Sequence, residues 1–165
     1  MPTAARPKIL VVDDRDDTLF AMESALAPLG YPVDRANNGD DALKAVLRGG
    51  IAVVLLDVLM PDVSGFEVAH YMARLEQTQD IPIMLITGAG QDPTLAVRAF
   101  ELGVADYVVK PIEPWVMRTK VRYLYDTSLR LRALRDRLRA YESEDEQHSA
   151  AAPGAFEDHP LPRPA

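Results

Sequence analysis

The stretch that decides the fold is Ile51-Ala52-Val53-Val54-Leu55-Leu56-Asp57, followed by the turn Met60-Pro61-Asp62-Val63-Ser64-Gly65. Six consecutive apolar residues predict a strand that is buried on both faces, as strands of parallel sheets are. An aspartate at the carboxyl end of such a strand lies where open α/β sheets build their ligand sites. We therefore take Asp57 as the centre of the candidate site.

Five apolar runs alternate with five segments of helical periodicity. The predicted strands are residues 8–12, 33–36, 51–56, 83–86 and 107–109, and the helices lie near 17–27, 39–48, 66–76 and 94–102, with the last beginning near 113. This alternation predicts βα units and a parallel sheet with helices on both faces. Right-handed crossovers bring the strand ends to one edge. That edge gathers five polar residues: Asp13, Asp14, Asp57, Thr87 and Lys110.

The length of 165 residues predicts one domain with an extension. We expect a lead at residues 1–6, a domain at 7–125, and a helical extension at 126–142. The last helix then measures about 39 Å at a rise of 1.5 Å per residue. Residues 143–165 contain four prolines and an alanine run, and they predict a disordered tail.

Composition excludes several classes of protein. Without cysteine, the chain has no disulfide, thiolate metal site or thiol nucleophile. No stretch approaches the ~20 apolar residues of a membrane helix, and the start does not resemble a signal peptide, so we expect a cytoplasmic protein. The net charge of −7 argues against general binding to nucleic acid or anionic lipid, although residues 117–142 carry eight basic and three acidic groups.

The acidic residues after the first strand have two interpretations. Asp13 and Asp14 could be ordinary helix-capping residues, because Asp favours helix N-termini. Their predicted convergence with Asp57 favours a site instead, since three clustered carboxylates need either protonation or a cation. Oxygen ligands of this type suit Mg²⁺ or Mn²⁺. A metal held by acids beside Lys110 is an arrangement for phosphoryl transfer, with Asp57 as the nucleophile that forms an acyl phosphate.

Four motifs resemble the receiver (CheY-like) domains of two-component response regulators. Each motif alone is moderately specific, and all four in order are very specific; they are Ile9-Leu10-Val11-Val12-Asp13-Asp14, Asp57-Val58-Leu59-Met60-Pro61-Asp62-Val63-Ser64-Gly65, Ile86-Thr87-Gly88 and Asp106-Tyr107-Val108-Val109-Lys110-Pro111. The resemblance covers residues 7–125. It implies a doubly wound, flavodoxin-like (βα)5 fold with strand order 2-1-3-4-5, followed here by an extended C-terminal helix.

The resemblance also implies roles for the site residues. Asp57 would accept phosphate from a histidine kinase or a phosphotransfer protein. Asp14, Asp57 and the Leu59 carbonyl would bind Mg²⁺ directly, with Asp13 acting through water. Thr87 and Lys110 would contact phosphoryl oxygens, Tyr107 would turn inward when Thr87 moves, and the Lys110–Pro111 peptide would be cis.

Phosphate lifetime and output follow from the same resemblance. Leu59 and Ala89 occupy positions where receivers vary and where polar side chains can position the attacking water. Because both are apolar here, we expect slow self-hydrolysis of the phosphoaspartate. The expected output surface is the fourth helix, fifth strand and fifth helix of the receiver. The chain would thus be a signalling domain and not an enzyme.

A second catalytic interpretation uses the segment Asp14-Arg15-Asp16-Asp17-Thr18, which matches the D-x-D-x-T motif of haloacid-dehalogenase-like phosphatases. In it Asp14 is the nucleophile and Asp16 the acid. It lacks a late acidic pair after Lys110, and it gives no role to Asp57.

The final helix carries a leucine repeat. Leu124, Leu131 and Leu138 recur every seven residues, and Thr127, Leu134 and Tyr141 follow three positions later. This spacing predicts a coiled coil, and hence a homodimer through Leu124, Leu131, Leu134 and Leu138. A receiver helix that simply runs long is the alternative, which leaves a monomeric phosphorelay or partner-binding receiver. Charges leave register and orientation open, and the downstream effector is not visible in the chain.

Overall fold

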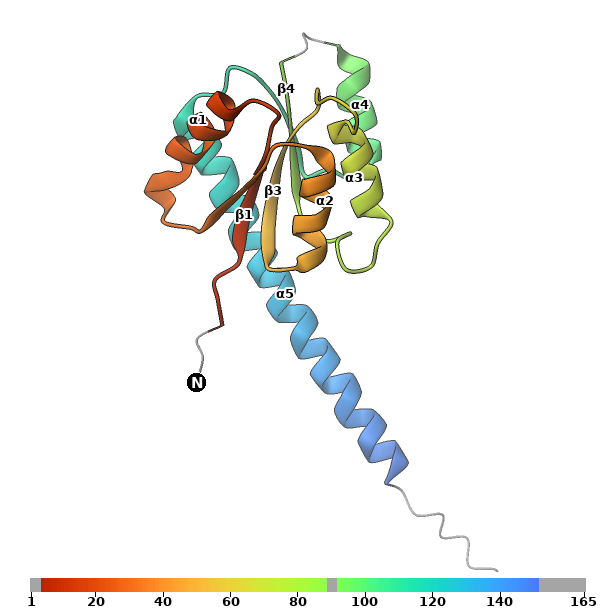
Figure 1. Cartoon of the computed structure of the whole chain (residues 1–165). Helices are drawn as coiled ribbons and strands as arrows, with labels where there is room; N and C mark the ends of the chain where they lie inside the picture. The colour runs from red at the N-terminus through yellow and green to blue at the C-terminus, as the bar shows by residue number, and fades with distance from the viewer. Residues whose placement is uncertain (1–3, 89–91, 152–165) are drawn as a thin grey trace, which may run out of the picture. The chain divides into compact units, whose positions relative to one another are not determined.

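The computed structural model describes residues 4–88 and 92–151, and the chain divides into two units (Figure 1). The first unit, Met1–Arg130, contains the whole sheet. The second unit, Leu131–Ala165, consists in its described part of the C-terminal portion of the last helix. We refer to them as the α/β unit and the helical unit.

The sheet has five parallel strands in the order β2-β1-β3-β4-β5. The strands are β1 Lys8–Val12, β2 Val33–Ala36, β3 Ile51–Asp57, β4 Ile83–Thr87 and β5 Asp106–Val109. Every residue of β3 and β4 is buried, which explains their unbroken apolar sequences. The predicted fold class and strand order are confirmed.

Helices cover both faces of this sheet (Figure 1). The helices are α1 Asp16–Leu26, α2 Gly39–Arg48, α3 Gly65–Ala73, α4 Pro93–Glu101 and α5 Pro114–Ala150, with a 3-10 turn, η1, at Ala27–Leu29. One apolar core lies between the sheet and α2, α3 and α4, and the other lies between the sheet, α1 and the first part of α5. The strand ends that carry the predicted site therefore lie between two packed layers.

The sequence fixes where the helices around the site begin. Asn38 caps α2 by accepting a hydrogen bond from the Asp41 N–H. Ser64 and Glu67 form a capping box at the start of α3, in which each side chain accepts from the other residue's backbone N–H. Asp92 caps α4, followed by proline at the first helical position. These caps set the lengths of the loops that follow the strands.

Helix α5 is longer than predicted. It continues to Ala150, so residues 143–150, which were expected to begin a disordered tail, are helical. The reason is local: this segment contains no glycine or proline, and alanine, glutamate and glutamine favour helix. The remainder of the predicted tail, 152–165, lies outside the described residues. Within the described chain, no helix has both the length and the apolar character needed to span a bilayer.

Leu124 belongs to the core of the α/β unit. It is 8% exposed and packs with Met117, Val121 and Tyr125 against the sheet. In this structure it is not accessible to a second helix, contrary to its predicted place in a dimer seam. The heptad spacing could not reveal this, because an apolar residue facing a sheet and one facing a partner helix have the same spacing.

Candidate functional site at the carboxyl edge of the sheet

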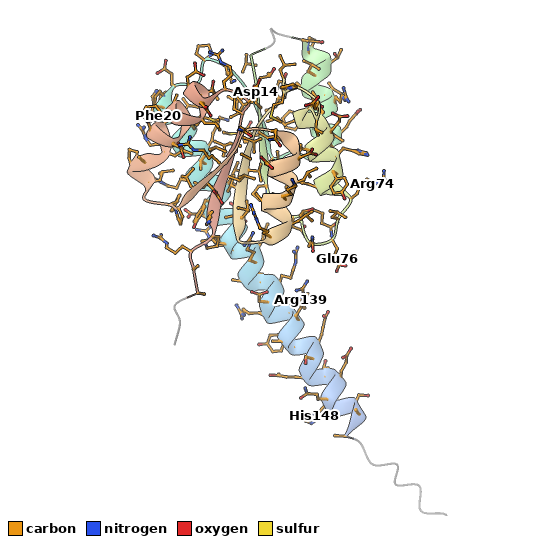
Figure 2. The ribbon with its side chains drawn as sticks, viewed as in Figure 1. Asp14, Phe20, Arg74, Glu76, Arg139 and His148 are labelled. Carbon is orange, nitrogen blue, oxygen red and sulfur yellow. The ribbon has the colours of Figure 1, made fainter. Side chains whose placement is uncertain are left out.

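Three carboxylates meet at the edge where β1 and β3 end. The two strands are paired with Val12 opposite Leu56, so the residues that follow, Asp13 and Asp57, are neighbours. Together with Asp14 they can place one oxygen each within 4.8 Å of one another. Asp13 and Asp57 are buried, whereas Asp14 is exposed at the edge of the sheet (Figure 2). The site is thus enclosed on its inner side and open to solvent at Asp14.

Lys110, immediately after β5, brings a positive charge to this cluster. Its Nζ donates a hydrogen bond to Asp13 Oδ2 at 3.0 Å and forms a longer ion pair with Asp57 Oδ1 at 3.5 Å. The second contact lacks hydrogen-bond geometry, so among the described residues Asp57 Oδ1 is a buried oxygen with no hydrogen-bond partner. A buried carboxylate oxygen in that state has an open coordination position.

The environment of Asp57 favours its neutral form. Burial is the main cause, the nearby negative charge of Asp13 adds to it, and Lys110 partly opposes both; together they raise the pKa of Asp57 from 3.8 to about 6. A carboxylate that is costly to ionise here becomes favourable to ionise once a cation is present.

The donor set fits a hard divalent cation. The cluster offers only carboxylate oxygens, one of them buried without a hydrogen bond, and the chain has no thiol ligand. Mg²⁺ prefers oxygen ligands and is commonly bound by one or two protein carboxylates together with water, which the exposed side at Asp14 would admit. Asp13, Asp14 and Asp57 are therefore suited to hold Mg²⁺.

The structure decides against the helix-capping interpretation of Asp13 and Asp14. The N-cap of α1 is Arg15, which makes no side-chain capping bond. Asp13 instead accepts from the Arg15 N–H through Oδ1, at 2.9 Å, while its other oxygen accepts from Lys110. This turn aims the Asp13 side chain at the site and away from the helix end.

Thr87 and Lys110 are linked through the backbone. Thr87 ends β4 and is fully buried, and its carbonyl accepts a hydrogen bond from the Lys110 N–H at 2.7 Å. The Val58 N–H, just after Asp57, donates to Ile86 O at 2.9 Å. Residues 57, 87 and 110 are consequently held on three adjacent strand ends, as predicted from the topology.

Tyr107 lies on β5 and packs against the core under α4. Its hydroxyl is buried and makes no hydrogen bond to any described residue. The ring is therefore turned inward in this structure, and its movement with Thr87 stays a prediction. Of the two residues expected to influence the lifetime of the phosphate, Leu59 has an exposed side chain and Ala89 lies outside the described residues.

The turn after Asp57 depends on Gly65, a residue to which the sequence interpretation gave no role. Its N–H donates to Val58 O at 3.0 Å, and a Cβ atom at this position would overlap the backbone carbonyl of Asp57. The turn can close against the end of β3 only because residue 65 has no side chain. The spacing of Gly65 behind Met60-Pro61 was the available signal. Farther along the edge, the Lys110–Pro111 peptide is cis, the geometry that the resemblance implied.

Known proteins with similar sequences and structures indicate the family to which a site of this kind belongs. The sequence model of the response regulator receiver domain matches residues 9–122. The transcriptional regulatory protein AfsQ1 of Streptomyces coelicolor is 34% identical over 116 residues, which cover 70% of this chain and 50% of that protein. A Vibrio cholerae protein named "Probable cyclic di-GMP phosphodiesterase" is 36% identical over 113 residues, which cover 68% of this chain and 25% of that one.

A solved response-regulator structure from Chloroflexus aurantiacus aligns with a TM-score of 0.68 and 30% identity, covering 73% of this chain and 98% of that one. The curated relatives are longer proteins, of which the matched part is half or less. The match extends over most of both cores and over the four motifs that surround the acidic cluster. The chain belongs to the response regulator receiver family.

Proposed function

We propose that this receiver accepts a phosphoryl group on Asp57 from a histidine kinase or a phosphotransfer protein, with Mg²⁺, or Mn²⁺ in its place, bound at Asp13, Asp14 and Asp57. The Leu59 carbonyl would complete the protein's contribution to the metal. The observation that supports this most directly is the cluster of three carboxylates, two of them buried, with Lys110 at 3.0 and 3.5 Å from those two.

In the transfer step, an ionised oxygen of Asp57 attacks the phosphorus of a phosphohistidine. A P–O bond forms as the P–N bond breaks, and the imidazole nitrogen keeps the electron pair and regains a proton. Bound metal would supply positive charge to the phosphoryl oxygens and hold Asp57 in its ionised form. Hydrolysis of the acyl phosphate by water returns the carboxylate and inorganic phosphate.

Lys110 and Thr87 would read the phosphorylated state. Lys110 is already within ion-pair distance of Asp57, so it can turn from Asp13 toward a phosphoryl oxygen without moving its backbone. Thr87 would donate its hydroxyl to another such oxygen. Tyr107 packs against the core under α4. A shift of Thr87 toward the phosphate would therefore change the space available to this ring and favour a different position of α4.

The surface that changes on phosphorylation and contacts a partner would be formed by α4, β5 and α5. These elements carry exposed apolar side chains, including Val97 and Phe100 on α4, Val109 on β5 and Tyr123 on α5. We propose that this surface and the exposed leucines of the helical unit form a homodimer whose stability depends on phosphorylation. A monomeric relay that passes phosphate onward through the same surface is the competing proposal.

The haloacid-dehalogenase-like alternative has no support. Receiver domains, the family to which the chain belongs, are phosphoacceptor signalling modules and not classical enzymes. Asp16, which that alternative needs as its acid, is the exposed first residue of α1 and is not part of the carboxylate cluster.

Mass spectrometry and light scattering, each in the presence and absence of Mg²⁺ and acetyl phosphate, test the proposed function: the first measures phosphoryl incorporation and the second the mass of the assembly. We expect Mg²⁺-dependent incorporation of one phosphoryl group, together with a shift from monomer toward dimer. Incorporation without a change in mass would favour the monomeric relay. An absence of incorporation with any small-molecule donor or histidine kinase would refute the phosphoacceptor role.

A further inference from the structure

The helical unit has almost no core of its own. Of its described residues, 131–151, all are exposed except Arg132, which is intermediate. Four apolar side chains recur along it at heptad positions and are 50–63% exposed: Leu131, Leu134, Leu138 and Tyr141. A helix in water obtains most of its stability from packing an apolar face, and isolated helices of this length are marginal. This surface is therefore suited to a partner helix.

The charges of α5 between residues 130 and 146 are divided into two blocks. Residues 130–139 contain five arginines and one aspartate, a net charge of +4. Residues 142–146 contain three glutamates and one aspartate, a net charge of −4. Figure 2 labels two residues of α5 that help to locate the blocks: Arg139 ends the basic block, and His148 lies two residues beyond the acidic block. The blocks are adjacent in sequence, and each is more than one helical turn long.

We propose that the partner is a second copy of this chain and that the two helices pair antiparallel, with the basic block of each copy beside the acidic block of the other. This rests on the dimer proposed above and assigns its orientation. In a parallel pair, like blocks would lie side by side over both their lengths. In an antiparallel pair centred between the two blocks, each block faces its opposite, and the attraction operates in both directions.

The heptad positions and the charges together define a register for this pair. Antiparallel coiled coils place a positions against d positions, with e facing e and g facing g across the seam. When Leu138 packs against Tyr141 of the second copy, Arg135 faces Glu142 and Arg137 faces Glu144. Each contact occurs twice because of the two-fold symmetry. The pair then has four opposite-charge contacts around two apolar layers, and the next layers outward place Leu131 against His148 and Leu134 against Asp145 of the second copy.

The other antiparallel register is disfavoured by charge. Packing Leu131 against Tyr141 and Leu134 against Leu138 would align more apolar residues. It would bring Arg130 against Glu144, but it would also bring Arg135 against its own copy, and Arg137 likewise, and like charges placed directly across a seam repel. Its attractive and repulsive contacts therefore offset each other, whereas those of the first register are all attractive. The proposal therefore places the centre of the pair between residues 139 and 140.

The absence of cysteine allows a clean distance measurement. Ala133, Ala140 and Gln147 share one heptad position, so single-cysteine variants of the full chain carry spin labels that differ only in their place along the axis. For the proposed register, labels on the two copies are offset along the axis by about 20 Å at 133, about 2 Å at 140 and about 22 Å at 147, at 1.5 Å per residue. Pulsed electron paramagnetic resonance should give its shortest distance at 140.

Three other outcomes would overturn the orientation, the dimer or the register. Equal distances at all three positions mean a parallel pair, which rejects the antiparallel proposal and leaves the dimer of the proposed function intact. A monomer in light scattering under phosphorylating conditions rejects both. Similar offsets at 133 and 140, of about 9 Å and about 12 Å at 1.5 Å per residue, would mean that the apolar register, centred at residue 136, is adopted. That result would overturn the ion pairs proposed here.

A charge-reversal pair gives an independent readout. Arg135→Glu with Arg137→Glu should weaken the antiparallel dimer, because all four opposite-charge contacts become repulsive. In a parallel pair the same changes would offset each other, one contact becoming attractive and the other repulsive. Arg132→Glu with Arg139→Glu alters the net charge equally at positions away from the seam and should leave most of the dimer. Equal effects of the two variants on the dimer dissociation constant would contradict the proposal.

Discussion

Replacing Asp57 by asparagine should stabilise the protein in the absence of metal. The side chain is 4% exposed, its Oδ1 has no hydrogen bond to a described residue, and Asp13 places a second negative charge beside it. Asparagine keeps the shape of the side chain and removes the buried charge. The site proposed for phosphorylation would then also lower the stability of the folded protein.

The expected size follows from the pKa of Asp57, which is raised from 3.8 to about 6 in the folded protein. Two pKa units correspond to about 3 kcal/mol. The folded state binds this proton more tightly than the unfolded state, so the associated stability is fully present below pH 4 and is lost as the pH rises through 6. At pH 7.5, Asp57→Asn should raise the free energy of unfolding by up to about 3 kcal/mol, or Tm by about 5–10 °C.

Urea unfolding in EDTA at pH 7.5 and at pH 4 measures this effect. The stabilisation by Asp57→Asn should be large at pH 7.5 and small at pH 4, and Mg²⁺ should stabilise the wild type but not the variant. Asp62→Asn, which removes a charge from an exposed residue of the same turn, is the matched control and should change stability by less than about 0.5 kcal/mol. A variant no more stable than wild type at pH 7.5, or equally stabilised at both pH values, would refute the reasoning.

Three further predictions concern the turn at Gly65, the packing of α5 and the lifetime of the phosphate. Gly65→Ala should lower the free energy of unfolding by about 3 kcal/mol, because the added methyl group overlaps the carbonyl of Asp57; wild-type stability in urea would contradict this. Tyr125→Phe removes a 2.7 Å hydrogen bond to a backbone carbonyl and should cost about 1 kcal/mol, whereas Tyr123→Phe, at an exposed ring, should cost almost nothing. The phosphorylated wild type should decay slowly, and Leu59→Glu should shorten its half-life in a phosphate-release assay; a wild-type half-life of seconds would show that the apolar side chain does not protect the phosphate.

The fold could be predicted because its signals are local or topological. The apolar run of β3 and its neighbours, and the alternation of strands with helices, give a parallel sheet, and a parallel sheet brings residues 13, 57, 87 and 110 to one edge whatever the details of packing. Strand boundaries agreed to within one residue at each end because buried runs end abruptly at polar or turn residues.

The features that sequence did not predict depend on distances between atoms. Lys110 was expected beside a phosphoryl group, and in this structure it also pairs with Asp13, which depends on how the two loops approach. Gly65 is required by the nearness of one backbone carbonyl; its spacing behind Met60-Pro61 indicates a turn but not this contact. Leu124 shows the limit of periodicity, since a heptad gives the face of a helix but not what covers that face.

The most direct test of the central claim is to locate the phosphoryl group. After incubation with acetyl phosphate and Mg²⁺, borohydride reduction converts an aspartyl phosphate to homoserine, and mass spectrometry of the digested chain identifies its position. The account predicts homoserine at position 57, and none when Mg²⁺ is removed with EDTA. Homoserine at position 13 or 14, or full phosphoryl incorporation into Asp57→Asn, would contradict it.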